Sequence, residues 1–251
     1  MVEKSLYFPI LGFSNVGHHQ LKSNYQYTNM DIENYIDSLT DIEKKHSPKN
    51  LFLTGDESLL FQKRRVSVVG SRNATQEGLR RAQIVSKALV KHDIIVVSGL
   101  ALGIDTMAHK TAIAFGGSTI AVLGTPLNKA YPRQNSDLLE LIKEKHLAVS
   151  QFPEGYPALP KNFPIRNRTM ALISDATIII EAGEKSGTRH QGWEALRLGR
   201  EVYLLENVAN DPSLTWAKEM MDYGAQSLSR ENIDMMLNDI PYLTSKYQDA
   251  F

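Results

Sequence analysis

The sequence predicts an α/β fold in which a doubly wound, mostly parallel sheet carries helices on both faces. The first observation is a series of short apolar runs after residue 64 that are rich in β-branched residues and lack polar alternation. Such runs are typical of strands buried on both faces of a parallel sheet. The second observation is that glycine or a polar turn, and then a helical pattern, follows each run. Alternating strands and helices of this kind indicate one layered domain.

The predicted elements follow one another in a regular order. Strands are expected at residues 66–70, 94–99, 119–124, 147–152, 176–181 and 201–205. Helices are expected at residues 75–92, 105–115, 134–145, 166–174 and 187–199, and two more at 213–229 and 230–240 close the domain. Thr75 and Asp105 stand where the N-caps of the first two helices are expected. The order is that of an extended Rossmann-like sheet.

The chain is expected to divide into a core and two short additions. Residues 51–240 hold every strand predicted above, and residues 241–251 form a tail. Residues 1–50 are polar and are expected to form a short helical appendage. Within this appendage, apolar residues recur at three- and four-residue spacing between residues 31 and 45, which predicts one amphipathic helix.

The composition excludes several classes of protein. Lys plus Arg and Asp plus Glu both number 28, so any affinity for a polyanion must come from a local patch. The chain has no cysteine and its seven histidines are scattered, so we expect no disulfide, metal or other cofactor. No apolar run reaches the ~18 residues of a membrane span. No signal-peptide pattern opens the chain, which favours a cytoplasmic protein without membrane contact.

The loops after the predicted strands are the places where a ligand is expected, because open parallel sheets bind ligands beyond the carboxyl ends of their strands. Five such loops lie at residues 70–75, 98–105, 124–135, 151–168 and 181–192. Four of them are rich in glycine or carry arginine or lysine. Glycine lets backbone N–H groups approach an anion, and arginine grips a phosphate with two hydrogen bonds. Together the loops predict a phosphate-binding rim.

Familiar nucleotide and catalytic motifs are missing from these loops. The sequence has neither the G-x-G-x-x-G dinucleotide pattern nor a Walker pattern, and it has no G-x-S-x-G nucleophile elbow. We therefore expect no catalytic residue. Ser98 is interpreted as an anion-binding or capping hydroxyl. Asp105 is interpreted as a helix cap that orders its loop, with His109 as a partner at best.

Five motifs in register resemble a known family. The stretches "LFLTGDESLL", "VSVVGSRNAT", "VVSGLALGIDTMAHKTAIAFGGSTIAVLGTPLNKAYPRQN", "NFPIRNRTMALIS" and "EAGEKSGTRHQGWEALRLGREVYLL" are similar to the Rossmann-type core of DNA-processing protein A, the Smf family. The resemblance covers about residues 50–240. It implies a homodimeric, non-enzymatic mediator that binds single-stranded DNA and loads the RecA recombinase during transformation.

The resemblance also implies a set of binding residues. Arg72 of "GSR" resembles the family's principal phosphate contact, and the "KNFPIRNR" and "EKSGT" segments continue the basic pocket. Phe163 is either a platform for a stacked base or a plug in the core. The complete set of expected DNA contacts is Ser71, Arg72, Ser98, Gly99, Asp105, Arg133, Lys161, Phe163, Arg166, Asn167, Arg168, Lys185, Ser186, Gly187 and Thr188.

Two alternatives stay open beside this resemblance, and the chain also departs from the family at one loop. The segment "SGTRHQGWEA" stands where the family usually has "SGSLITA". The same loop also resembles that of nucleotide phosphoribohydrolases, and this resemblance implies a catalytic glutamate where the chain has Gln191, which carries no negative charge. Glu194 lies one helical turn further on. A nucleotide-sensing module of a defence system could use the same phosphate-binding rim.

Overall fold

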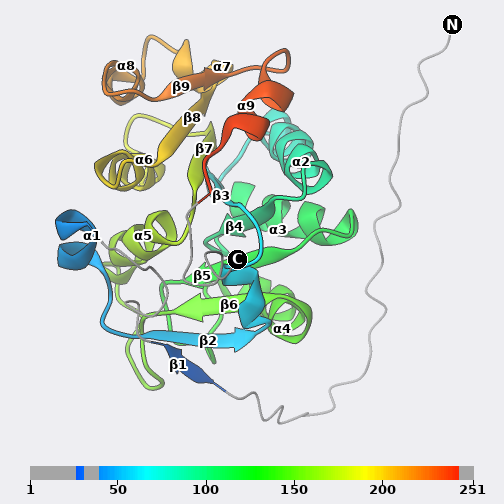
Figure 1. Cartoon of the computed structure of the whole chain (residues 1–251), viewed down its shortest axis with the longest axis vertical. Coiled ribbons are helices and arrows are strands. Elements are labelled where there is room, and N and C mark those ends of the chain that lie inside the picture. Colours follow the sequence, from blue (N-terminus) through cyan, green and yellow to red (C-terminus); the bar gives the residue numbers. More distant parts are fainter. Residues whose placement is uncertain (1–26, 31–39, 243–251) are drawn as a thin grey trace, which may run out of the picture.

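The computed structural model describes residues 27–30 and 40–242, and in that part of the chain nine strands form one sheet (Figure 1). Their order across the sheet is β1-β2-β6-β5-β4-β3-β7-β8-β9. The strands are β1 (Thr28–Met30), β2 (Leu51–Gly55), β3 (Arg65–Gly70), β4 (Ile95–Ser98), β5 (Thr119–Leu123), β6 (Leu147–Ser150), β7 (Ala176–Glu181), β8 (Glu201–Leu205) and β9 (Gln226–Leu228). In this spatial order, all neighbouring strands from β6 across to β9 pair in parallel. At the other edge, β2 pairs antiparallel with both β1 and β6. The predicted fold class is confirmed.

Helices cover both faces of the sheet (Figure 1). They are α1 (Asp41–His46), α2 (Gln76–Lys91), α3 (Ile104–Ala114), α4 (Ser136–Lys145), α5 (Asn162–Leu172), α6 (Thr188–Arg197), α7 (Glu206–Ala209), α8 (Thr215–Asp222) and α9 (Ile233–Asp239), with short 3-10 turns η2 (Glu57–Leu60) and η3 (Arg133–Asn135). Side chains of α5, α6 and α8 fill one core layer. Those of α2, α3, α4 and α9 fill the other. In the described part of the chain, no helix is long and apolar enough to cross a bilayer.

The six strands predicted from the sequence are β3 to β8, and three further strands were not predicted. The strand β1 lies inside the segment that was expected to be a helical appendage, and it pairs with β2. The strand β9 replaces the second half of the helix predicted at residues 213–229. That prediction was wrong because α8 ends at Asp222 and Gly224, at φ +104°, turns the chain back toward the sheet.

The helix predicted at residues 31–45 is only partly described. Residues 31–39 lie outside the described residues, and the helix that is seen begins at Asp41. Thr40 caps it, since its hydroxyl accepts the Glu43 backbone N–H and the Glu43 carboxylate accepts the Thr40 N–H. Glu43 is buried and also accepts a hydrogen bond from Arg200, which ties α1 to the start of β8.

The predicted N-caps have different outcomes. Thr75 caps α2, because its Oγ1 accepts the Gly78 N–H at 2.9 Å. Asp105 does not cap α3, whose N-cap is Gly103 at φ +74°. A Cβ at residue 103 would lie 2.3 Å from the Ser71 carbonyl oxygen, so this turn requires glycine.

The order of the strands creates a topological switch point between β3 and β7. The chain first winds outward from β3 through β4 and β5 to β6, and α5 then returns it to β7 on the other side of β3. The connections after β3 and β7 therefore leave the sheet in opposite directions. Ligands of doubly wound sheets bind in the crevice that this divergence opens.

Candidate functional site

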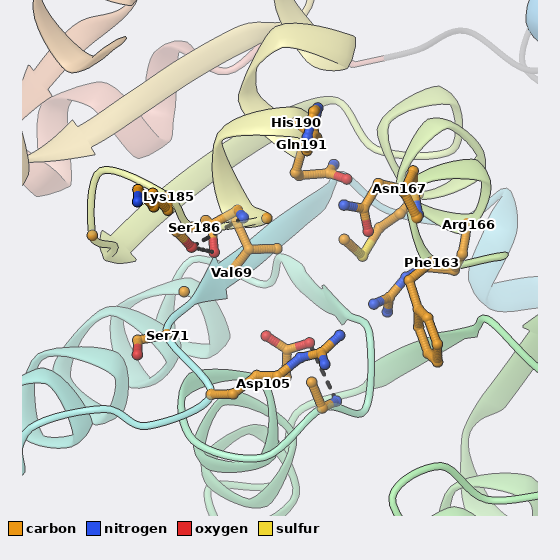
Figure 2. Close-up of a pocket in the computed structure, with 18 of the residues that line it drawn as sticks. Val69, Ser71, Asp105, Phe163, Arg166, Asn167, Lys185, Ser186, His190 and Gln191 are labelled. Atoms are coloured by element: carbon orange, nitrogen blue, oxygen red, sulfur yellow. Dashed lines mark hydrogen bonds between the residues drawn. The ribbon is translucent and has the colours of Figure 1, made fainter. Parts of the chain in front are cut away.

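A cavity of about 550 Å³ lies at the carboxyl ends of β3 and β7 (Figure 2), and we call it the switch-point pocket. Its walls are the loop after β3, the start of α3, the first turns of α5, and the loop that leads into α6. The residues that line it are Val69, Gly70, Ser71, Arg72, Asn73, Ala101, Asp105, Phe163, Pro164, Arg166, Asn167, Met170, Gly183, Lys185, Ser186, Gly187, Thr188, His190 and Gln191. Figure 2 shows Lys185 and Ser186 across the pocket from Phe163 and Arg166.

The pocket brings together most of the residues expected from the sequence. Those that line it are Ser71, Arg72, Asp105, Phe163, Arg166, Asn167, Lys185, Ser186, Gly187 and Thr188. Gly99 lines a smaller neighbouring cavity of about 140 Å³, which shares Arg72, Phe163 and Arg166 with the first. The loops after β3, after β4 and before α6 and the first turns of α5 thus meet at one place.

Four expected contacts lie outside both cavities. Ser98 is fully buried in the sheet, where its hydroxyl donates to the Val68 carbonyl at 2.7 Å. Arg168 donates from Nε to the Glu194 carboxylate at 3.2 Å. Arg133 and Lys161 are exposed and line neither cavity. The structure therefore does not bring these four residues together with the others in either cavity.

The helix N-termini on the α2 and α3 side of the pocket already hold carboxylates. Glu181, at the end of β7, accepts from the Thr75 N–H at 2.9 Å and from the Thr75 hydroxyl at the start of α2. Asp105 accepts from the Gly99 N–H at 3.1 Å and from the Ala101 N–H at 3.3 Å, beside the start of α3. An external phosphate at either position would meet an internal negative charge.

The N-terminus of α6 differs from these two because, in the described residues, no carboxylate accepts from its backbone N–H groups, and no side chain of its N-cap residue caps it. Its N-cap is Gly187, and the Ser186 hydroxyl accepts the Thr188 N–H at 3.1 Å and donates to Thr188 Oγ1 at 2.9 Å. Lys185, directly before this turn, is exposed. Backbone N–H groups, hydroxyls and an ammonium group therefore converge on one helix N-terminus, which is the arrangement that binds anions.

Arg166 is a buried cation in the wall that the two cavities share. Arg166 is 5% exposed, and its Nη1 donates to the Val122 carbonyl at 3.0 Å. Burial lowers the pKa of Arg166, and the nearby Asp105 charge partly opposes this. Burial likewise raises the pKa of Asp105, against the opposing effects of Arg166, of the Gly99 and Ala101 N–H groups and of Arg72. Arg166 thus adds positive potential behind the pocket rather than a mobile surface charge.

The loop after β4 is held in a strained conformation beside the pocket. Leu100 is fully buried and has φ +59°, in the left-handed region that side chains disfavour. Asp105 binds the N–H groups on either side of it, and Asn135 Nδ2 donates to the Leu100 carbonyl at 2.8 Å. The predicted role of Asp105 in ordering its loop therefore agrees with the structure, although His109 is not its partner and instead bonds Thr119 at 2.7 Å.

Phe163 forms the partition between the two cavities. Its ring lies 5.0 Å from the Tyr131 ring at an interplanar angle of 42°, and the Arg72 guanidinium lies 5.4 Å from its centroid. A Cβ at residue 124 would come within 2.7 Å of the ring, so Gly124 makes room for it. Phe163 is half-buried and contacts both the aromatic and the cationic part of the site.

Among the polar and aromatic residues that line the two cavities, sequence reasoning left four out of the expected contacts. Asn73, His190 and Gln191 line the larger cavity and Tyr131 lines the smaller one. Gln191 could have been found from helix spacing. It lies three residues after Thr188, an expected DNA contact, and residues three apart share a helix face. Glu194 lies outside both cavities, and its carboxylate binds Arg168 and Arg197. It therefore does not supply the carboxylate that Gln191 lacks.

Comparison with known proteins gives relatives over most of the chain. The DNA processing protein DprA of Bacillus subtilis is 32% identical over 205 residues, which are 81% of this chain and 68% of that protein. Across the curated relatives, the chain spans between 42% and 68% of their length.

Two solved structures share the fold. DNA processing protein A of Streptococcus pneumoniae superposes with a TM-score of 0.73 at 30% identity, covering 86% of this chain and 75% of that one. DNA processing protein A of Helicobacter pylori, whose structure concerns its mode of single-stranded DNA binding, gives 0.73 at 26% identity over 88% of this chain and all of that one. A model of the DNA recombination-mediator protein A family matches residues 26–241. The chain belongs to the DNA recombination-mediator protein A family.

Proposed function

We propose that this protein binds single-stranded DNA through the switch-point pocket. The observation that carries the proposal is the convergence of Lys185, Arg72 and the uncapped N-terminus of α6 on one cavity. A groove of this kind fixes phosphates by charge and by N–H donors, and an aromatic face beside it suits a base. The family relationship and the single-stranded DNA binding of the Helicobacter pylori relative support the same ligand.

The distribution of charge favours a DNA strand over a mononucleotide in the usual Rossmann position. That position is the N-terminus of the first crossover helix, α2, and here Glu181 occupies it. The phosphate is instead assigned to the other side of the switch point, between Arg72 and Lys185. The neighbouring nucleotides of the strand then extend past the exposed rim of the pocket.

The role assigned to the protein is that of a mediator without catalysis. We propose that it acts in DNA uptake and recombination, as a cytoplasmic homodimer that delivers the bound strand to a recombinase of the RecA type. A homodimer presents two switch-point pockets to one strand. Sedimentation of the purified protein tests the dimer, and strand-exchange assays with a RecA-type recombinase test the delivery of DNA.

The binding itself is tested by titrating labelled oligothymidine at several salt concentrations. The dissociation constant should rise steeply with salt, and in Arg72→Ala the slope of log K against log salt should flatten by about 0.7. Arg80→Ala is the matched control, because Arg80 is exposed on α2 and pairs with Glu77 outside the pocket. Salt-independent binding, or no binding, would contradict the proposal.

A further inference from the structure

The wall of the switch-point pocket carries two carboxamides that the proposed phosphate contacts do not use. They belong to Asn167 on α5 and Gln191 on α6, and Figure 2 shows the two side chains pointing toward one another. Gln191 is 1% exposed and its Nε2 donates to Thr177 Oγ1 at 3.4 Å. Within the described residues, its Oε1 has no hydrogen-bond partner. Buried carbonyl oxygens are nearly always paired, so this acceptor indicates a donor on a ligand.

The neighbours of Gln191 add both donors and acceptors. Asn167 is half-buried, and no hydrogen bond of its side chain occurs in the described part of the chain. Its amide presents a carbonyl and an NH₂ group. Arg166 also lines the pocket, and its buried Nε is unpaired among the residues 27–30 and 40–242. Three polar groups without internal partners thus belong to one cavity.

The rest of this wall is apolar. Val69 and Met170 are 4% and 1% exposed, and both line the same pocket. A phosphate beside them would be desolvated against apolar groups, which is unfavourable for a charged group. Apolar surface with a few convergent polar groups instead suits a planar ring with a polar edge.

We propose that this wall, which we call the carboxamide wall (Asn167, Gln191, Val69 and Met170), reads the edge of one base of the bound strand. The inference rests on the proposed function and adds a base preference to it. An exocyclic amino group has two N–H donors and so satisfies two carbonyl oxygens, and a carboxamide pairs with adenine through two hydrogen bonds. Thymine has no amino group. The carboxamide wall therefore favours adenine over thymine.

The experiment compares dT15 with the same oligonucleotide carrying one central adenine, by competition against labelled dT15. The wild type should bind the adenine oligonucleotide at least about fivefold more tightly, as a bidentate pair with the correct base implies. In Gln191→Met and in Asn167→Ala this ratio should fall to about one. The second variant guards against misfolding, because the Asn167 side chain makes no hydrogen bond that holds the described fold together.

Gln226→Met is the matched control, since Gln226 lies on the edge strand β9 and bonds Glu201 at 2.9 Å. It should keep the wild-type ratio. Equal affinities for the two oligonucleotides in the wild type, or a ratio that survives both variants, overturns the carboxamide wall while leaving DNA binding intact. Failure of the wild type to bind either oligonucleotide overturns the proposed function and this inference together.

Discussion

The guanidinium of Arg166 occupies the space that a side chain at residue 99 would need. An ideal Cβ built on Gly99 would lie 1.4 Å from Arg166 Nη1 and 2.3 Å from Cζ. Gly99 is not among the glycines with positive φ, so packing rather than backbone conformation requires it. Gly99 looks like a turn residue in the sequence, but the structure requires glycine there to make room for the buried Arg166 guanidinium behind the proposed DNA site.

Gly99→Ala should therefore displace Arg166 and destabilise the protein. Overpacking in a close-packed interior costs about 1–3 kcal/mol, which denaturant unfolding measures. Part of this cost should disappear when the guanidinium is also removed, so Gly99→Ala should cost less in an Arg166→Met background. Gly183→Ala is the control, because nothing lies within 4 Å of a Cβ at that position. Additive costs in the double variant would show that the two residues do not compete for space.

Replacement of Phe163 separates its two interpretations, a base platform and a core plug. A base stacked on an aromatic ring contributes about 1–3 kcal/mol, so Phe163→Leu should weaken oligothymidine binding about 5- to 150-fold while it keeps apolar packing. The measurement is fluorescence anisotropy together with thermal unfolding. Tyr156→Ala, which breaks another tilted ring pair at 5.2 Å outside both cavities, should leave DNA binding unchanged. Wild-type affinity in Phe163→Leu would assign the ring to packing alone.

Lys185 and Arg168 should differ in their effect on DNA binding, although the sequence suggests the same role for both. Lys185 lines the pocket beside the N-terminus of α6, whereas Arg168 is held by Glu194 outside it. Lys185→Ala should reduce the salt slope by about 0.7. Arg168→Ala should leave the slope unchanged. Both slopes come from the same salt titration, and a reversed result would move the phosphate path from α6 to the exposed side of α5.

The sequence predicted the parallel strands that are buried on both faces, and it missed β1, β2 and β9. The β-branched runs of β3 to β8 are continuous enough to identify a parallel sheet. In contrast, β1 and β9 have only three residues each. That is too few to show the alternation of apolar and polar residues by which a strand is recognised. They become strands through pairing with β2 and β8, which is a tertiary effect.

The site was predicted as a set of loops more successfully than as a set of side chains. The loops could be grouped because the carboxyl ends of parallel strands lie at one edge of the sheet, where ligands bind. The direction of each side chain depends on helix phase: Arg166 and Arg168 are two residues apart and so face about 200° from each other on α5. One cation therefore points into the pocket while the other pairs with Glu194 on α6. The sequence shows that these cations are close together, but it does not show which of them points into the pocket.

His109 should make the stability of the protein depend on pH. It is fully buried, and burial, with smaller effects of the His146 and Arg166 charges, lowers its pKa to about 3. Thr119 Oγ1 donates to the Val96 carbonyl and so accepts from His109 Nδ1–H, which identifies the neutral tautomer. In the unfolded chain, the imidazole takes up a proton near its ordinary pKa of about 6.5. Between these two pKa values, the unfolded chain binds more protons than the folded protein. The free energy of unfolding should therefore fall as the pH is lowered through this range.

The expected loss from His109 is about 2–3 kcal/mol between pH 7.5 and pH 4.5, with no further gain above pH 7.5. Urea unfolding across this range measures it, and the comparison with His109→Asn removes the contribution of the carboxylates. The variant keeps a short amide donor but has no titrating group, so its pH slope should be shallower than that of the wild type. His190→Asn, at an exposed histidine on the pocket wall, should keep the wild-type slope. Equal slopes for His109→Asn and the wild type would mean that the buried imidazole is protonated in the folded protein, despite the burial that lowers its pKa.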